Sequence, residues 1–131
     1  MFRKVALLLL MPVLLSGCAS KIDHSTPQTL AESYLRAAID HDFEAMVEAW
    51  SPAMRAKLRE YCTPYNISES ELAAFTLELG GSEGKAEQRR IADDPAEFAR
   101  AAAEMAALPV VTGDREEGLV FIGGKWYLQF Y

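Results

Sequence analysis

The chain has few of the residues that hold a small domain together through covalent bonds or metal ions. Its 131 residues include two cysteines, Cys18 and Cys62, and two histidines. Two cysteines allow at most one internal disulfide, and no cysteine or histidine spacing resembles a metal site. We therefore expect no cofactor, no metal, and a fold that depends on its hydrophobic core.

Positive charge is also scarce. The 13 Lys and Arg residues stand against 19 Asp and Glu residues, which gives a formal net charge of −6. An acidic chain is a poor partner for nucleic acid or for an anionic lipid surface. The acidic residues are scattered and form no run, which is typical of a solvated acidic surface, so no nucleic-acid partner is expected.

The apolar stretch Val5–Leu15 is too short to cross a membrane, since a spanning helix needs roughly 20 residues. It follows the basic pair Arg3-Lys4 and precedes the small residues Ser16-Gly17. This order of basic, apolar and small residues is typical of a secretory signal.

The end of this segment carries a more specific pattern. Leu15-Ser16-Gly17-Cys18 resembles the lipobox of bacterial lipoproteins. The resemblance implies cleavage between Gly17 and Cys18 and attachment of lipid to Cys18, whereas ordinary secretion would leave Cys18 in the discarded peptide. By resemblance to the lipoprotein sorting pattern, Ala19 and Ser20 imply the outer membrane, with the protein facing the periplasm.

Cleavage would divide the chain into three parts: a signal peptide (1–17), a polar tether (18–26) and a single small domain (27–131). The signal takes away two basic residues and no acidic one, so the mature chain carries a formal charge of −8. Cys62 is then either a buried, inert thiol or a partner in a disulfide between two chains. Its place on the apolar side of a helical pattern favours the buried thiol.

Capping residues predict that the first part of the domain is helical. Thr26-Pro27, Ser51-Pro52 and Asp94-Pro95 each place a capping side chain before a proline at the first helical position. Asp42 is expected to cap a short helix, and Ser68 is expected to open another through a capping box.

The middle of the chain is less clear. Residues 66–92 are ambiguous between helix and strand, because Leu72, Phe75 and Leu79 fit a helix whereas alternate residues fit a strand. The caps favour a helix. Residues 80–84, which include three glycines, are predicted to form a flexible loop.

In the last quarter of the chain the hydrophobic pattern changes to the two-residue alternation that is typical of β-strands. Gly123-Gly124 predicts a two-residue hairpin turn, which places Phe121 opposite Trp126. Residues 112–117 are expected to close a first hairpin with Val110-Val111. One face of the sheet should be the core side; its residues are Leu119, Phe121, Trp126, Leu128 and Phe130. The other face carries Val120, Ile122, Tyr127 and Gln129. The predicted fold class is α+β, with N-terminal helices packed on a C-terminal antiparallel β-meander.

Two segments resemble a known family. Residues 27–52 resemble the opening of the nuclear-transport-factor-2-like (cystatin-like) domains of bacterial envelope lipoproteins, and the closing Gly123–Leu128 resembles their final hairpin. The resemblance implies a curved antiparallel sheet wrapped on helices, sometimes with a conical pocket. We expect a reduced form of that fold.

Few residues are candidates for chemistry. His41 between Asp40 and Asp42 is the one arrangement that could serve acid–base catalysis, but a capped turn between helices explains it better. Glu44 and Glu48 share a helix face and are typical of a solvated surface. We expect no catalytic residues. Candidates for lining a ligand pocket are Tyr34, Trp50 and Trp126, although core packing also accounts for the two tryptophans.

These observations favour a lipid-anchored periplasmic binding or accessory module without catalysis, attached to the membrane through Cys18 and docking a periplasmic protein. Two alternatives stay open. The first is a small-ligand pocket protein, rarely an enzyme, on a cystatin-like scaffold. The second is an inhibitor or immunity protein that neutralises a basic hydrolase.

Overall fold

The computed structural model describes residues 20–112 and 116–130. Within these residues six α-helices come first: α2 (Pro27–Ile39), α3 (Phe43–Glu48), α4 (Pro52–Cys62), α5 (Glu69–Glu78), α6 (Gly81–Asp93) and α7 (Pro95–Ala106). A 3-10 turn, η1 (Thr63–Tyr65), follows α4, and strands β1 (Gly118–Ile122) and β2 (Lys125–Gln129) come last. The fold class is therefore α+β, as expected. In the described residues the sheet is one antiparallel hairpin rather than a meander. None of the helices described is both long enough and apolar enough to span a membrane.

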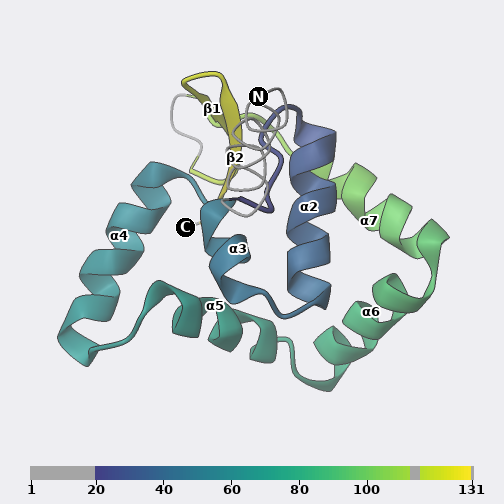
Figure 1. Ribbon diagram of the computed structural model, residues 1–131, viewed down its shortest axis with the longest axis horizontal. Coiled ribbons are helices and arrows are strands. Elements are labelled where there is room, and N and C mark those ends of the chain that lie inside the picture. Colours follow the sequence, from purple (N-terminus) through teal and green to yellow (C-terminus); the bar gives the residue numbers. More distant parts are fainter. Residues whose placement is uncertain (1–19, 113–115, 131) are drawn as a thin grey trace, which may run out of the picture.

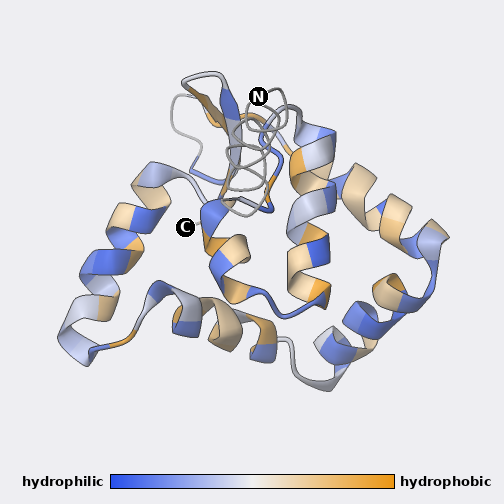
Figure 2. Ribbon diagram, viewed as in Figure 1, coloured by the Kyte–Doolittle hydropathy of each residue, from blue (hydrophilic) through white to orange (hydrophobic). Residues whose placement is uncertain are grey.

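The helices surround a central pair. Figure 1 shows α2 and α3 in the middle of the molecule, with α4 and α5 around one side, α6 and α7 around the other, and the hairpin at one end. Figure 2 shows that hydrophilic residues dominate α6, whereas hydrophobic residues run along β1. This arrangement leaves α6 at the margin of the core, where it buries Ile91 alone among its described residues.

The expected caps are present. The side chains of Thr26, Asp42, Ser51, Ser68 and Asp94 each accept a hydrogen bond from a backbone N–H in the first turn of the helix that follows. The capping box of Ser68 confirms the helix expected after it, which is α5. In each case the cap satisfies an N–H group that the helix itself leaves unpaired.

The loop expected at residues 80–84 is wrong, because α6 begins at Gly81. Gly81 has a φ of +62°, which glycine adopts without strain, and this residue turns the chain from α5 into α6. Gly80 and Gly84 lie close together: a Cβ on Gly80 would come 3.0 Å from the Gly84 Cα atom. The glycines thus form a tight turn between two helices.

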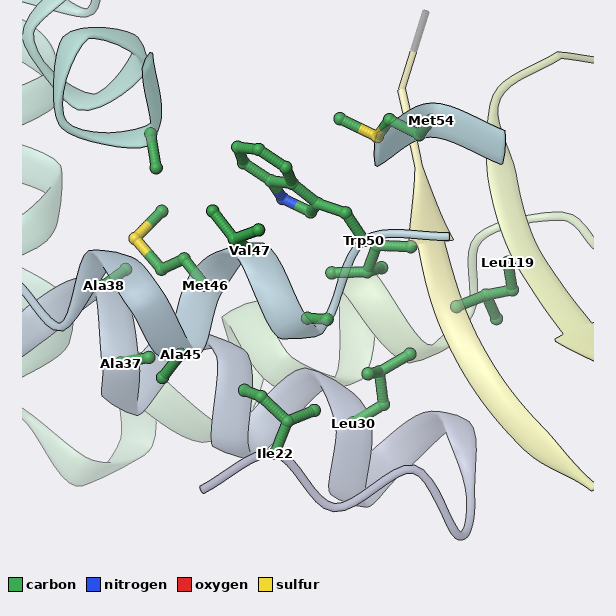
Figure 3. Close-up of a cluster of buried hydrophobic side chains, with 13 residues drawn as sticks. Ile22, Leu30, Ala37, Ala38, Ala45, Met46, Val47, Trp50, Met54 and Leu119 are labelled. Atoms are coloured by element: carbon green, nitrogen blue, oxygen red, sulfur yellow. The ribbon is translucent and has the colours of Figure 1, made fainter. Parts of the chain in front are cut away.

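The core lies between α2, α3 and the hairpin (Figure 3). Its buried apolar side chains come from α2 to α5, from both strands and from the segments before α2 and after α3: Ile22, Leu30, Ala37, Ala38, Ala45, Met46, Val47, Ala49, Trp50, Met54, Ala73, Leu119 and Leu128. Ile22 belongs to the expected polar tether, yet it is buried beside Leu30. The described part of that tether, residues 20–26, therefore packs against the domain.

The hairpin has the predicted register, with Phe121 opposite Trp126 and Leu119 opposite Leu128. Gly123 and Gly124 both have positive φ, as the turn requires. The expected first hairpin with Val110-Val111 is wrong. Val110 instead forms an isolated parallel bridge with Leu119.

Gly118 allows the segment at Pro109–Val110 to lie close to the start of β1. It has a φ of +141°, and a Cβ there would lie 2.0 Å from the carbonyl oxygen of Pro109. Only glycine lets the incoming strand pass so near to the segment that leaves α7.

The expected core face of the hairpin is buried at one end only. Leu119 and Leu128 are buried, Trp126 is half-buried, and Phe121 and Phe130 are exposed. The helices cover the end of the hairpin away from the turn, so Phe121 packs on the Trp126 ring instead, with centroids 4.8 Å apart. Gln129, expected on the outer face, is also buried, and it makes two hydrogen bonds that are described below.

Candidate functional site

Two of the three expected pocket residues line one groove. Tyr34 on α2 and Trp50 after α3 contribute to a hollow of about 430 Å³ between α4 and α5. Its other lining residues are Met54, Leu58, Tyr61, Leu72, Thr76 and Phe130. We call it the α4–α5 groove. Trp126, the third expected residue, lies on β2 and does not line it.

The groove is apolar with one polar pair. The indole N–H of Trp50 donates a hydrogen bond of 3.4 Å to the phenol oxygen of Tyr34. Burial raises the pKa of the Tyr34 phenol above its usual value. The hydroxyl is therefore protonated at neutral pH and keeps its O–H as a hydrogen-bond donor.

Apolar side chains continue from the groove onto the surface. Tyr61 is 62% exposed at its edge, Phe75 on α5 is 54% exposed, and Leu79, the residue directly after α5, is 69% exposed. Leu72, Phe75 and Leu79 are spaced three and four residues apart, so they form one row along α5. Isolated exposed apolar residues are ordinary, but a row beside an apolar groove is a candidate interaction surface.

Ion pairs hold the two walls of the groove together. Glu69, the first residue of α5, accepts hydrogen bonds from Arg55 (3.1 Å) and Arg59 (3.0 Å) of α4. Partial burial alone would raise the pKa of the Glu69 carboxyl, but the bonds from Arg59 and Arg55 outweigh it and keep that pKa below its usual value. The groove is thus built between helices with a fixed spacing.

Cys62 is a buried free thiol at the end of α4, as expected for the inert alternative. Burial raises the pKa of the thiol, and the nearby Glu69 and Glu71 carboxylates raise it further. The nucleophilic form of cysteine is the thiolate, so this environment lowers its reactivity.

His41 lies in the turn between α2 and α3. It is exposed, has a φ of +56°, and stacks on Phe43 with ring centroids 5.8 Å apart. It lines a second hollow of about 480 Å³ with Lys85 and Arg89 of α6. Asp42 caps α3 and pairs with Lys21 at 2.7 Å, so it does not orient the imidazole.

Other expected residues form no centre. The carboxylate of Glu48 accepts a hydrogen bond from Ser20 (3.0 Å), and Glu44 is exposed. Across residues 20–112 and 116–130, no group of three or more His, Cys, Asp or Glu residues could hold a metal ion. The expected cleavage and lipidation residues, Gly17 and Cys18, lie outside the described residues.

Sequence reasoning missed the row on α5. Its signal was present in the spacing of Leu72, Phe75 and Leu79. That spacing predicted a helix, but it also indicates an apolar side of the helix that other elements need not cover.

Comparison with family models, curated proteins and solved structures finds no match for this chain.

Proposed function

We propose that the protein is a lipid-anchored, non-catalytic binding module of the bacterial envelope, whose α4–α5 groove docks an apolar segment of a periplasmic protein. The observation that carries this proposal is the exposed apolar rim. Tyr61 and Leu72 line the groove, and the exposed Phe75 and Leu79 continue the row that starts at Leu72. Hydrogen bonds from Arg55 and Arg59 to Glu69 join the two helices that form its walls. A preformed apolar groove is one of the recurrent ways in which proteins bind an amphipathic segment.

The anchor is the second part of the proposal, and the lipobox supports it. Cys18 would carry the lipid, and Ala19 and Ser20 favour the outer membrane with the domain in the periplasm. Replacing Cys18 by Ser should abolish incorporation of labelled palmitate and move the protein out of the membrane fraction. Equal labelling of variant and wild type would contradict the anchor.

We also propose that the domain is a reduced, helix-rich relative of the cystatin-like envelope domains. Its support is that the two resembling segments contact each other. The N–H of Leu128 donates to the Ala49 carbonyl oxygen, and the N–H of Ser51 donates to the Leu128 carbonyl oxygen, both at 2.8 Å. The segments that carry the resemblance are thus one structural unit.

A small-ligand pocket is the second candidate function, favoured by the Tyr34–Trp50 pair inside the groove. An apolar molecule with one hydrogen-bond acceptor would fit this chemistry. The inhibitor alternative has less support, because arginines bind several of the acidic side chains that would meet a basic enzyme; these are Glu69, Glu87, Glu97 and Glu104.

Site-specific photocrosslinking tests the proposed docking. A photoreactive amino acid at Phe75 should give a discrete adduct with one protein in intact envelopes, and the same amino acid at the exposed Ala99 of α7 should not. Leu79→Asp should abolish the adduct without changing thermal stability, because Leu79 is mostly exposed. Retention of the adduct in Leu79→Asp would contradict docking at this groove. Crosslinks to a bound small molecule instead would favour the second candidate.

A further inference from the structure

The surface around the start of the described chain combines segments from both ends of the sequence. Residues 20–25 line one open hollow of about 520 Å³ together with Gly124 and Lys125 of the hairpin. Figure 1 shows the segment before α2 running between α2 and the hairpin. We call the surface formed by residues 20–25 and the hairpin turn the anchor-side face.

This face is held together by hydrogen bonds. The N–H of Trp126 donates to the carbonyl oxygen of His24 at 2.9 Å, and the His24 Nδ1 atom lies 2.7 Å from the carbonyl oxygen of Trp126. The His24 ring also packs on Tyr127, with centroids 4.7 Å apart. The start of the domain is thereby fixed to the strand that follows the turn.

The residues before His24 are also fixed. Ile22 is buried in the core, the Asp23 N–H donates to Ser33 at 3.0 Å, and Ser20 donates to Glu48 at 3.0 Å. The described part of the expected tether is therefore packed against the domain, and only Ala19 separates Cys18 from these contacts in the sequence.

Cys18 stands two residues before Ser20 in the sequence. Two residues reach at most about 7 Å when fully extended. A lipid on Cys18 would therefore keep Ser20 within about 7 Å of the lipid attachment point, and would bring the anchor-side face against the bilayer.

The hairpin tip carries side chains suited to that position. Phe121 is 54% and Ile122 45% exposed, and the two lie immediately before the Gly123-Gly124 turn. An exposed aromatic ring and a branched aliphatic chain gain by entering the boundary between headgroups and acyl chains. The chain as a whole is acidic, so apolar contact and the anchor, rather than charge, would carry this association.

We propose that Phe121 and Ile122 enter the outer part of the bilayer beside the lipid on Cys18, and so hold the domain in one orientation on the membrane. This inference rests on the proposed anchor. In Figure 1, α5 lies at the end of the molecule opposite the hairpin turn. The orientation therefore directs Phe75 and Leu79, on the rim of the groove, away from the bilayer and toward the periplasm.

A fluorescent label at the tip tests the proposal. Ile122→Cys is labelled with an environment-sensitive fluorophore in the full lipidated protein, which is then reconstituted into vesicles of phosphatidylethanolamine and phosphatidylglycerol. Cys62 is 3% exposed, so wild type treated with the same fluorophore should take up little label and measures the background labelling. Glu83→Cys, exposed in the first turn of α6, is the matched control position.

The label at position 122 should shift to blue emission and should be quenched by lipids with brominated acyl chains, whereas the label at position 83 should do neither. Adding Phe121→Ser should reduce the quenching at position 122. Equal quenching at both positions, or none at position 122 in protein that floats with the vesicles, would overturn the proposed orientation. A blue shift without quenching would mean that protein covers the tip, and would also overturn it.

The anchor is tested separately in the same preparation. Cys18→Ser protein should not float with the vesicles. If it floats as well as the wild type, the proposed anchor fails, whatever the label at the tip reports.

Discussion

Ser51 and Ser68 cap two neighbouring helices, but only Ser51 does so inside the protein. The Ser51 hydroxyl oxygen accepts a hydrogen bond from the Met54 N–H at 3.1 Å, and the same hydroxyl donates to the Gln129 Oε1 atom at 2.7 Å. Gln129 donates in turn to the carbonyl oxygen of Glu116 at 3.1 Å. Ser51 is fully buried and Gln129 is 6% exposed. The hydroxyl therefore joins the start of α4 to the end of β2.

Replacing Ser51 by Ala removes two interactions at once. Loss of a cap costs about 1 kcal/mol. The amide oxygen of Gln129 would also be left buried without a partner, at a cost of about 1–3 kcal/mol. The sum is about 2–4 kcal/mol. Ser68→Ala is the matched control, because Ser68 is an exposed cap and should cost about 1 kcal/mol alone.

Thermal unfolding, followed by circular dichroism in the unlipidated Cys18→Ser background, measures both changes. For a domain of this size 1 kcal/mol lowers the Tm by about 4–8 °C. We expect a loss of about 4–8 °C for Ser68→Ala and roughly two to four times as much for Ser51→Ala. Equal losses for the two variants would refute the reasoning.

A double substitution tests the pair itself. Gln129→Leu replaces the amide by an apolar side chain of similar size, so Ser51→Ala in that background leaves no buried oxygen without a partner. The double variant should therefore be more stable than the sum of the two single changes implies. Additive losses would mean that the Ser51–Gln129 hydrogen bond contributes nothing beyond the cap.

Three further predictions follow from the backbone and from the cap of α3. Gly118→Ala should cost about 3 kcal/mol or more, because its Cβ would lie 2.0 Å from the Pro109 carbonyl oxygen at a φ of +141°; an unchanged urea midpoint would contradict this. His41→Gly should stabilise the protein by up to about 1 kcal/mol by relieving a φ of +56°, and His41→Ala, which keeps that φ, should give no gain. Asp42→Asn keeps the cap but loses the pairing with Lys21, whose hydrogen bond lowers the pKa of Asp42. Because the pKa of Asp42 is lower in the folded protein than in the unfolded chain, its charge stabilises the fold at pH values above the unfolded pKa. Wild type should therefore be more stable than Asp42→Asn at neutral pH. It should lose this advantage as the pH falls below 3.8, the ordinary aspartate pKa. A difference that persists in acid would rule out the charge as its cause.

The helix caps and the hairpin register could be predicted from the sequence because they depend on residues that are close together along the chain. Each cap needs a side chain within three residues of the N–H that it bonds, so Thr26, Asp42, Ser51, Ser68 and Asp94 identified their helices. The hairpin register likewise follows from the two glycines of its turn.

Contacts between distant segments could not be predicted in the same way. Val110 was expected to pair antiparallel with the next strand, but the approach of Pro109 to Gly118 sets a parallel bridge. Gln129 was assigned to the outer face by alternation, yet it is buried against the start of α4, where Ser51, which lies 78 positions earlier, donates a hydrogen bond to it. Alternation fixes which side of a strand a residue occupies, and the helices decide which side is covered.

The candidate site shows the same division. Tyr34 and Trp50 were chosen as aromatic residues that could line a pocket, and they line the same groove. Trp126 has the same chemistry but lies on the hairpin beside Phe121. The residue type alone does not show which aromatic side chains line the groove, because that depends on how α2 and α4 pack in space.

The bonds that join the hairpin to earlier parts of the chain also bear on when folding can finish. β2 is bonded along its outer edge to His24 and to the segment Ala49–Ser51, and both strands supply core residues. The helical part therefore cannot complete its core until residues 118–130 have been synthesised, because β1 and β2 supply part of that core. In the exported lipoprotein that we propose, this order of synthesis would keep the emerging polypeptide from finishing its fold in the cytosol, so that it could pass through a translocation channel as an extended chain.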